Sequence, residues 1–560
     1  MLRAKIVSSL EKCFVDQTPD DFGEIKALSV YKNVLASVQI LVYDDAEYSG
    51  SDWPCRWLSV KVTEPFVDSI RLRSVESVPN YMPAYETPKK LAGIDPHFLR
   101  VTPGLYPDIL AEGTHSDKFP LINQQLHPIW LDFTPNEQIS AGEYEVNIAL
   151  ECEGKELISI PFKIRVLPFC LPSQQTRVTN WFYADCLADY YEVEPFSDRH
   201  FEICENFIKT AVDNGINMIM MPVLTPPLDT AVGGERTTTQ LVKITVNNGE
   251  YSFDFTNVCR WLDICKRAGV KYIEVNHLFT QWGAYHAPKV MATVDGEYKK
   301  IFGWQTDASG EEYVAFLRKL LKELTEVLAN NWEKENVYFH LSDEPTDEHL
   351  QQYKQNKKNL ADILEGFKII DALSHVQFYK DGLCEIPIPC SNVVHDFLNE
   401  DIKERWVYYC CFPTHKYSNR FLATSLPRLV SLGMQMYKFK IEGFLQWGYN
   451  FYNNRFSDDF VNPYLNMTAG YWGIGGDAAI VYPGRHGKAT ESIRLLAFKS
   501  AMDDIRLMKL CESYYSHERV VEEIESVTGT IDFDHCTEDS ATIIKMRERL
   551  NELILNAIDK

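Results

Sequence analysis

The sequence predicts a multidomain protein that combines all-β and α/β folds: an N-terminal β-sandwich, a TIM-type (β/α)8 barrel and C-terminal helices. Three observations support this fold class. Residues 1–170 alternate apolar and polar positions, with turn residues between the runs. Residues 171–510 instead alternate short apolar runs with long amphipathic segments, which indicates βα units. Residues 511–560 are charged and amphipathic, which is typical of surface helices. A chain of 560 residues is long enough for two or three domains.

The first domain is predicted to be a sandwich of two β-sheets. Alternating apolar positions occupy residues 30–43 and 56–62, and two further strands cover residues 142–150 and 157–166. Packing two sheets face to face is the natural way to bury one face of each strand. A segment bracketed by prolines, residues 167–172, then links this domain to the next one.

The second domain contains eight short apolar runs that we interpret as the strands of a barrel. These runs are residues 178–182, 218–222, 272–276, 337–341, 376–379, 392–395, 406–409 and 443–447. Amphipathic helices follow the first four, the seventh and the eighth run, whereas the fifth and sixth units are abbreviated. Eight parallel strands with intervening helices predict a TIM-type barrel.

Charge and cysteine content argue against several classes of partner. The net charge of −23 makes nucleic acid an unsuitable ligand. No apolar run is long enough to cross a bilayer, so no membrane insertion is expected. Residues 1–12 carry charges throughout and do not resemble a signal peptide, and the 14 cysteines form no CxxC pair. We therefore expect a cytoplasmic protein with reduced cysteines, and its oligomeric state is unknown at this stage.

Two adjacent carboxylates, Asp343 and Glu344, follow the apolar run of residues 337–341. Neighbouring anions are costly to desolvate, and their pKa values split, so that one carboxyl can hold a proton while the other is ionised. Barrel enzymes place their catalytic groups at such strand ends. The alternative is a strand-to-helix turn, in which Ser342 or Asp343 caps a helix and Pro345 takes its first position.

Polar and aromatic residues also follow the other predicted strands. Aromatic rings stack on the C–H faces of sugars, and amides and carboxylates bind hydroxyl groups. A single aromatic residue is more often part of the core, but the recurrence at strand ends favours a carbohydrate site. The residues concerned are Asn180, Trp181, Tyr183, Asn276, His277, Trp282, Tyr285, Tyr408, Tyr409, Gln446, Trp447, Tyr449 and Asn450.

The sequence has no recognisable motif for a metal or a cofactor. It contains no HExxH motif, no paired Cys/His spacing, no P-loop, no dinucleotide fingerprint and no Gly-x-Ser-x-Gly elbow. His277 and His286 are too far apart for one helical face, and the neighbours Cys410 and Cys411 are not expected to form a disulfide or a metal site. We therefore expect neither a cofactor nor a catalytic metal.

Three short motifs resemble those of glycoside hydrolase family 123 and of the larger group that shares its catalytic domain. They are His340-Leu-Ser-Asp-Glu-Pro345, Gly443-Phe-Leu-Gln-Trp-Gly-Tyr-Asn450, and Gly476-Asp-Ala-Ala-Ile-Val-Tyr-Pro-Gly484 with Glu491-Ser-Ile-Arg494 after it. Their order and spacing match over roughly residues 165–510, and the N-terminal sandwich fits the family layout. The resemblance implies a retaining β-N-acetylgalactosaminidase that acts on an oligosaccharide or glycoconjugate, with Asp343 and Glu344 as catalytic residues.

The spacing of the two carboxylates agrees with catalysis assisted by the substrate. Ordinary retaining glycosidases need two carboxyl groups about 5 Å apart on opposite sides of the bond, which consecutive residues do not easily provide. In the mechanism that the resemblance implies, the 2-acetamido group of the substrate attacks C1 and forms an oxazolinium ion. Asp343 would orient that group, and Glu344 would protonate the leaving oxygen and then deprotonate water.

The expected substrate-binding residues combine strand-end residues with the end of the third motif. Trp447 and Tyr449 would line the sugar site, whereas Glu491 and Arg494, one helical turn apart, either pair structurally or bind hydroxyl groups. The full set is Asn180, Asn276, His277, Trp282, Tyr409, Trp447, Tyr449, Glu491 and Arg494.

Two other hypotheses stay open on the sequence alone. One is a non-catalytic glycan-binding protein on a degenerate barrel, which the intact Asp343–Glu344 pair disfavours. The other is a glycosidase of different sugar specificity, with a distant nucleophile such as Asp185 or Glu442. The absence of an export signal suggests imported oligosaccharides as substrates. Only the resemblance favours the galacto over the gluco epimer, and no residue pattern indicates the linkage.

Overall fold

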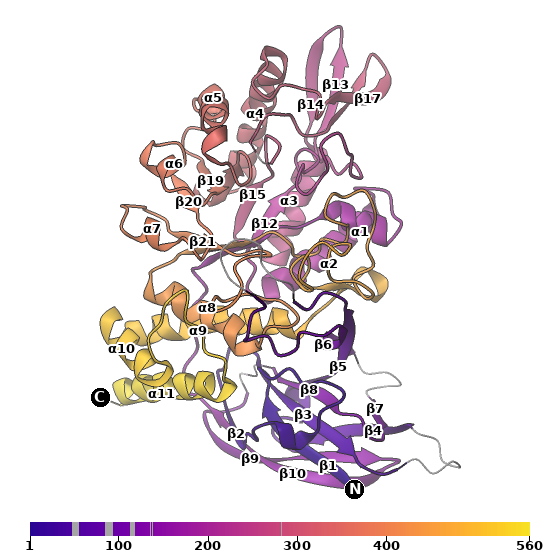
Figure 1. Cartoon of the computed structure of the whole chain (residues 1–560), viewed down its shortest axis with the longest axis vertical. Coiled ribbons are helices and arrows are strands. Elements are labelled where there is room, and N and C mark those ends of the chain that lie inside the picture. Colours follow the sequence, from indigo (N-terminus) through magenta and orange to yellow (C-terminus); the bar gives the residue numbers. More distant parts are fainter. Residues whose placement is uncertain are drawn as a thin grey trace. The chain divides into compact units, whose positions relative to one another are not determined.

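The computed structural model describes residues 1–47, 55–84, 93–112, 118–134, 136, 138–281 and 283–559, and the predicted site residue Trp282 lies outside the described residues. The chain forms two compact units (Figure 1). Unit 1 comprises Met1–Gln174, Thr414–Lys438 and Thr490–Lys560, and unit 2 comprises Gln175–Pro413 and Phe439–Ala489. The all-β region therefore shares a unit with residues 414–438 and 490–510, which lie within the segment that the sequence assigned to the barrel.

Unit 1 contains two five-stranded β-sheets (Figure 1). In spatial order, the first sheet consists of β1 (Leu2–Ser8), β3 (Ala36–Asp44), β8 (His127–Phe133), β5 (Ile70–Asn80) and β6 (Gly104–Glu112). The second sheet consists of β2 (Ala27–Val30), β10 (Lys155–Val166), β9 (Gly142–Cys152), β4 (Cys55–Val62) and β7 (Phe119–Ile122). Neighbouring strands are antiparallel, except that β2 pairs with β10 in parallel.

The apolar positions of both sheets form one hydrophobic core. On β9, Val146, Ile148 and Leu150 are buried and alternate with more exposed residues. Val38 and Ile40 of β3, on the other sheet, belong to the same cluster. Because side chains alternate across a strand, this pattern buries one face of each sheet. The predicted N-terminal all-β region is confirmed.

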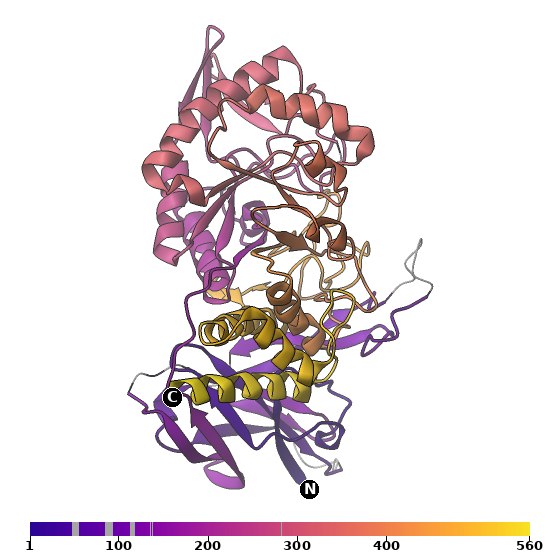
Figure 2. The ribbon, with the colours of Figure 1, turned by 90° about the vertical axis from the view of Figure 1, so that its left-hand side faces the viewer.

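The helices of unit 1 are α8 (Leu426–Lys438), α9 (Ile493–Glu512), α10 (His517–Thr528) and α11 (Ser540–Ile558). In Figure 2 the yellow helices lie beside one another, and α9 packs against α8, α10 and α11. Gly433 allows α8 to approach α9 closely, because a Cβ atom at this position would lie 2.4 Å from the carbonyl oxygen of Ala501. Among the helices that the structure describes, none has the length and hydropathy needed to cross a bilayer.

Unit 2 contains an eight-stranded parallel sheet that curls into a nearly closed barrel. In chain order the strands are β11 (Arg177–Asn180), β12 (Met218–Met221), β15 (Tyr272–Val275), β18 (Val337–His340), β19 (Lys368–Ala372), β20 (Ile386–Ile388), β21 (Trp406–Tyr408) and β22 (Gly443–Gln446). Their spatial order is β20-β19-β18-β15-β12-β11-β22-β21. The two ends of this order meet at a parallel bridge between Cys390 and Tyr408, so the predicted barrel is confirmed.

Helices connect the strands of the barrel. They are α1 (Ala184–Tyr190), α2 (Asp198–Asp213), α3 (Thr256–Ala268), α4 (Glu311–Asn331), α5 (Leu350–Leu360), α6 (Gln377–Lys380) and α7 (His395–Leu398). Local sequence explains several helix ends. The side chain of Ser197 accepts a hydrogen bond from the N–H of His200 and caps α2, and Gly269 ends α3 with a φ of 86°.

The fifth and sixth strands are not where the sequence placed them. Residues 376–379 and 392–395 overlap the short helices α6 and α7, and the true strands are β19 and β20. The apolar positions at Val376 and Phe378 resemble a strand, but they belong to one helical turn. Pro387 concealed β20, because a proline lacks the N–H group that a strand interior normally donates.

Unit 2 also contains a four-stranded sheet that the sequence analysis did not predict. Its order is β14 (Glu250–Asp254), β13 (Lys243–Asn247), β16 (Val290–Val294) and β17 (Glu297–Phe302). Both hairpins belong to the connections that follow β12 and β15. Such connections begin at the carboxyl ends of the strands, where barrel enzymes place their sites. Short two-residue strands, β23 (Tyr482–Pro483) and β24 (Ala489–Thr490), follow β22.

Candidate active site

Carboxyl groups gather at the carboxyl ends of the barrel strands. Asp343 and Glu344 follow β18, and Asp371 belongs to β19. Asp229 lies in the connection after β12, and Asp477 lies in the connection after β22. The electrostatic coupling of Asp343 to Glu344, Asp229 and Asp371 places these groups in one cluster. Such a cluster of carboxyl groups at a strand-end face is characteristic of a functional site.

Glu344 is exposed and has an unusual backbone conformation. Its φ of 45° lies in the left-handed region, which non-glycine residues seldom adopt and which often marks functional positions. Its N–H donates to the carbonyl oxygen of Ala372 at 3.0 Å. The hydroxyl group of Tyr408 donates to Oε1 of Glu344 at 2.7 Å. The carboxyl group is therefore held in place from β21 while it stays accessible to a ligand.

Asp343 lies in a more protected environment than its neighbour. Burial raises the pKa of Asp343 well above its usual value, and the Glu344, Asp229 and Asp371 carboxylates raise it further. Placing like charges together makes ionisation of Asp343 costly, which favours its protonated form. The two adjacent carboxyl groups can therefore serve as one proton donor and one charge-stabilising group.

Asp477 links the end of β22 to this cluster. Its Oδ2 accepts a hydrogen bond from Nε1 of Trp447 at 3.0 Å, and its Oδ1 accepts one from Nε2 of Gln446 at 2.9 Å. Trp447 is 7% exposed, and its ring also packs edge-on against Phe451. The indole N–H of Trp447 is thus committed to Asp477, which fixes the orientation of the ring.

A buried polar network lies inside the barrel beside the carboxyl cluster. Glu274 of β15 accepts hydrogen bonds from Thr179 and from Nε1 of Trp181, and its Oε1 lies 3.1 Å from Nε2 of His340. Burial lowers the pKa of His340, but Glu274 and Asp371 outweigh that effect and raise it overall. His340 therefore lies between the carboxyl groups of Glu274 and Asp371, which favour its protonated form.

Asp371 connects this network to the loop that carries the catalytic pair. Its Oδ2 accepts a hydrogen bond from the hydroxyl group of Tyr353 at 2.7 Å and a longer one from the N–H of Ser342 at 3.4 Å. The hydroxyl group of Ser342 donates to the carbonyl oxygen of Thr280 at 3.1 Å. These contacts hold the residue that directly precedes Asp343.

Most of the predicted substrate-binding residues are almost completely buried. The exposed fractions are 2% for Asn180, 1% for Asn276, 0% for His277, 0% for Tyr409, 7% for Trp447 and 0% for Tyr449. They lie at the ends of β11, β15, β21 and β22, as expected. The hydroxyl group of Tyr449 donates to the carbonyl oxygen of Phe207 in α2, so this residue packs the barrel against its helix. Tyr449 therefore has a packing contact, and its expected role in sugar binding stays a prediction.

His277 is buried among aromatic rings. Its ring lies 4.4 Å from that of His340 and packs edge-on against Trp181. Burial, together with the neighbouring His340, lowers the pKa of His277 well below its usual value, so its imidazole is neutral. Within the described part of the chain, neither ring nitrogen of His277 has a hydrogen-bond partner.

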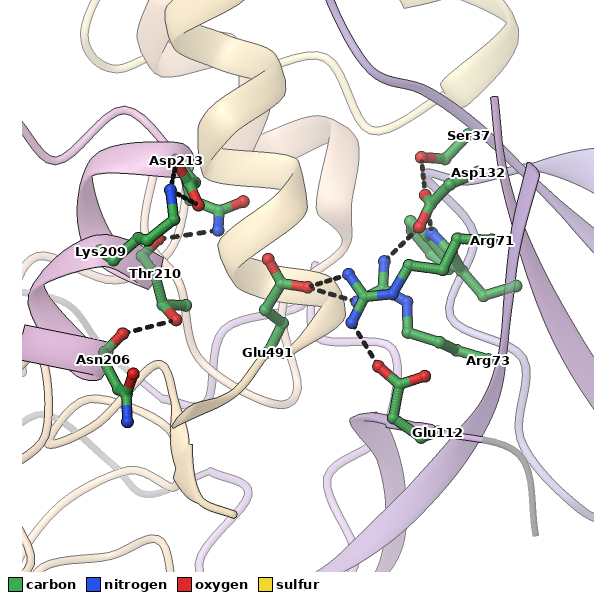
Figure 3. Close-up of polar contacts among 12 residues, drawn as sticks. Ser37, Arg71, Arg73, Glu112, Asp132, Asn206, Lys209, Thr210, Asp213 and Glu491 are labelled. Atoms are coloured by element: carbon green, nitrogen blue, oxygen red, sulfur yellow. Dashed lines mark hydrogen bonds and ion pairs between the residues drawn. The ribbon is translucent and has the colours of Figure 1, made fainter. Parts of the chain in front are cut away.

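Glu491 and Arg494 form ion pairs with strands of unit 1, and Figure 3 shows those of Glu491. Arg494 is fully buried, and its Nε and Nη2 each donate to the carboxylate of Asp108 in β6 at 2.8 Å. Glu491 accepts from Nη1 of Arg73 at 2.5 Å and from Nη1 of Arg71 at 3.2 Å. Of the two alternatives for Glu491 and Arg494, structural ion pairing or binding of sugar hydroxyl groups, the contacts fit ion pairing. The partners are residues of β5 and β6.

The two alternative nucleophiles have other roles. Arg236 donates to Oδ2 of Asp185 from Nε at 2.9 Å and from Nη2 at 2.6 Å, and both side chains are buried. Glu442 precedes β22 and pairs with Arg177, the first residue of β11, at 4.0 Å. Glu442 therefore lies at the amino ends of the strands, away from the carboxyl cluster, and cannot attack a substrate bound there.

Sequence reasoning does not assign several residues of the cluster to the site. Tyr408 and Tyr409 both follow the same predicted strand, but only one of two neighbouring strand residues can point toward the site, and Tyr408 is the one that contacts Glu344. Asp371 lies in a strand that was not recognised. Asp477 belongs to the third sequence motif, which could have indicated it, whereas nothing in its surroundings distinguished Asp229. In the described part of the chain, no group of three or more His, Cys, Asp or Glu side chains is arranged to hold a metal ion.

A barrel with adjacent carboxyl groups at the carboxyl end of a strand is an architecture that glycoside hydrolases use. The family comparison agrees, because the model described as "Glycoside hydrolase 123, catalytic domain" matches residues 181–511. The chain therefore belongs to glycoside hydrolase family 123.

A solved structure has the same fold. A family 123 glycoside hydrolase from Clostridium perfringens, described for glycolipid glycan hydrolysis, superposes with a TM-score of 0.74 at 14% sequence identity. The match covers 100% of this chain and 99% of that one. A family 39 glycoside hydrolase from Bacteroides cellulosilyticus WH2 matches with a TM-score of only 0.34 at 10% identity, over 86% of this chain and 82% of that one, which is too distant to support an argument. No curated protein matches the chain.

Proposed function

We propose that this protein is a retaining β-N-acetylhexosaminidase whose nucleophile is the 2-acetamido group of the substrate. The observation that carries the proposal is the adjacency of Asp343 and Glu344, together with their different surroundings. Consecutive residues do not easily lie on opposite sides of a sugar about 5 Å apart, as a conventional retaining pair must. Asp185 and Glu442, the two alternative nucleophiles, pair with Arg236 and Arg177 instead, which further supports the substrate as the source of the nucleophile.

In the first step, the acetamido oxygen attacks C1 while the bond from C1 to the leaving oxygen breaks. Glu344 gives its proton to the leaving oxygen. Asp343 accepts a hydrogen bond from the acetamido N–H and stabilises the positive charge that develops on the group. This role requires Asp343 to be ionised when the substrate is bound, and the positive charge that develops on the acetamido group offsets the burial and the neighbouring carboxylates that raise its pKa.

In the second step, Glu344 acts as a base. Its carboxylate removes a proton from water, the water oxygen attacks C1, and the bond from C1 to the acetamido oxygen breaks. The product keeps the original configuration, and the acetamido group is restored. The hydroxyl group of Tyr408 stabilises the ionised form of Glu344 between the two steps, because it donates a hydrogen bond to that carboxylate.

The proposed sugar is N-acetylgalactosamine, at the non-reducing end of an oligosaccharide or glycoconjugate. The support for this choice is the family membership and the fold shared with the Clostridium perfringens enzyme, which is described for glycolipid glycans.

A screen of 4-nitrophenyl glycosides tests the proposal. It should include the β-N-acetylgalactosaminide, the β-N-acetylglucosaminide and the parent galactoside and glucoside. We expect turnover of the acetamido substrates, with the galacto epimer preferred, and almost none of the parents. Faster turnover of a parent glycoside would point to a different sugar specificity. Binding of these sugars without any turnover would point to a glycan-binding protein.

A further inference from the structure

The connection after β12 carries a carboxyl group that the proposed mechanism does not use. Asp229 is half-buried, and its carboxyl is coupled electrostatically to Glu344 and Asp477. Burial raises the pKa of Asp229 to about 7, against the opposing effect of Arg236, and the neighbouring carboxylates contribute. Within the described residues, no side chain donates a hydrogen bond to this carboxyl group.

Other loops of the barrel hold the backbone of Asp229 in place. Its N–H donates to Oε1 of Gln281 at 2.7 Å, and its carbonyl oxygen accepts from the hydroxyl group of Ser457 at 2.7 Å. The preceding carbonyl oxygen, of Leu228, accepts from Nη1 of Arg236 at 2.8 Å. These contacts maintain a φ of 47° at Asp229, a conformation that a non-glycine residue keeps only where its surroundings impose it.

This arrangement fixes the backbone that carries the carboxyl group before any ligand binds. A ligand that supplies hydrogen-bond donors would gain from a carboxyl group that is already partly desolvated. A shared cation does not fit, because in the described part of the chain no group of three or more His, Cys, Asp or Glu side chains is arranged to hold a metal ion. A neutral hydroxyl donor fits better, and the sugar that binds at Asp343 and Glu344 carries several.

We propose that Asp229 is a specificity-determining residue that accepts hydrogen bonds from free hydroxyl groups of the sugar bound at Asp343 and Glu344. The proposal rests on the function proposed above, because it takes the occupant of the site to be an N-acetylhexosamine. The Asp229 carboxylate would accept hydrogen bonds from hydroxyl groups of the sugar ring. Glu344 and Asp343 would meanwhile act at C1 and on the acetamido group.

Asp229→Asn, assayed on deoxygenated substrates, tests this role. We expect a roughly 10- to 100-fold loss of kcat/KM on the aryl N-acetylhexosaminide, as for one charged hydrogen bond. The 3-, 4- and 6-deoxy analogues of that substrate should identify the hydroxyl group. On the analogue that lacks it, the loss should fall below about 3-fold, because the contact is already missing. Asp459→Asn, which changes an exposed carboxylate in the connection after β22, is the matched control and should behave like the wild type.

Ser457→Ala is a second variant, which tests the same role if Asp229→Asn does not fold. Ser457→Ala removes only the hydrogen bond to the Asp229 carbonyl group, and it should show the same dependence on the deoxy analogues with a smaller loss. A loss that is equal on the parent and on every analogue, in whichever variant folds, would overturn the proposal. So would full activity of a folded Asp229→Asn variant.

Calorimetry separates this proposal from the proposed function. Free N-acetylgalactosamine and its deoxy analogues are titrated into the wild-type protein and the Asp229→Asn variant. If the wild type cleaves no acetamido glycoside but binds the sugar in a manner that depends on Asp229, the hydrolytic function fails and the specificity role stands. If the wild type cleaves acetamido glycosides and the variant binds every analogue as the wild type does, the specificity role fails and the function stands.

Discussion

Asp343 and Glu344 are neighbours in the chain, but their surroundings differ and suit them to different catalytic roles. Glu344 is exposed, in a left-handed backbone conformation, and accepts a hydrogen bond from Tyr408. Asp343 is half-buried, and burial and nearby carboxylates raise its pKa. An accessible carboxyl suits proton exchange with a leaving group and with water. A protected carboxyl suits stabilisation of charge on a bound acetamido group.

Glu344→Gln should lower turnover most for substrates with poor leaving groups. An aryl oxide departs with little help, whereas an alkoxide needs the proton that glutamine cannot supply. The measurement is kcat/KM of the variant on an aryl glycoside and on an alkyl glycoside of the same sugar. Equal losses on the two substrates would exclude Glu344 as the acid.

Asp343→Asn should cost activity on both kinds of substrate to a similar extent. Asp343 acts on the acetamido group, which attacks C1 whatever the leaving group is. The loss of one charge-stabilising group typically lowers kcat about 10²- to 10³-fold. The same pair of substrates provides the measurement, with the folded state checked by thermal unfolding. Activity close to that of the wild type would mean that the acetamido group needs no partner at this position.

At the scale of elements, helices α8 and α9 show how closely the chain of unit 1 is packed. Gly433 lets the two helices touch, because a side chain there would meet the backbone of Ala501. Gly433→Ala should therefore lower the free energy of unfolding of unit 1 by about 1–3 kcal/mol, although alanine favours a helix. Gly104→Ala is the control, since a Cβ atom at this position meets nothing within 4 Å. Scanning calorimetry of the full chain gives both values, and equal transition temperatures would contradict the packing argument.

The sequence predicted those elements whose signal is local. The strands of the sandwich alternate in exposure, and six of the eight barrel strands are short apolar runs followed by polar or aromatic residues. The prediction failed where a local pattern was ambiguous: Val376 and Phe378 fit a strand and a helical turn equally, and Pro387 disguised β20.

The candidate site was predictable in part for a similar reason. Asp343 and Glu344 stand next to each other in the chain, so a single stretch of sequence shows the pair. Asp229 and Asp371 reach the same cluster from separate strands and loops, and only the closed barrel brings them there. Arg494 forms an ion pair with Asp108, far away in the sequence, which no motif could reveal.

At the scale of the whole molecule, we predict that neither folding nor catalysis needs a metal ion. Within the residues that the structure describes, no group of side chains is arranged as a metal site, and the proposed mechanism uses only carboxyl groups and the substrate. Activity and the thermal unfolding temperature should be the same before and after dialysis against a chelator. Loss of activity in the chelator, restored by one divalent ion, would contradict this prediction.

The central claim is that the acetamido group of the substrate is the nucleophile, and a paired measurement tests it most directly. The first half is inhibition by a thiazoline that mimics the cyclised intermediate, relative to binding of the parent N-acetylgalactosamine. The second half is the rate of hydrolysis of the matched galactoside, which carries a hydroxyl group in place of the acetamido group. We predict that the thiazoline binds at least about 10²-fold more tightly than the parent sugar, as intermediate analogues do, and that the galactoside is almost inert. Weak inhibition by the thiazoline with rapid cleavage of the galactoside would contradict the account and require a nucleophile from the protein.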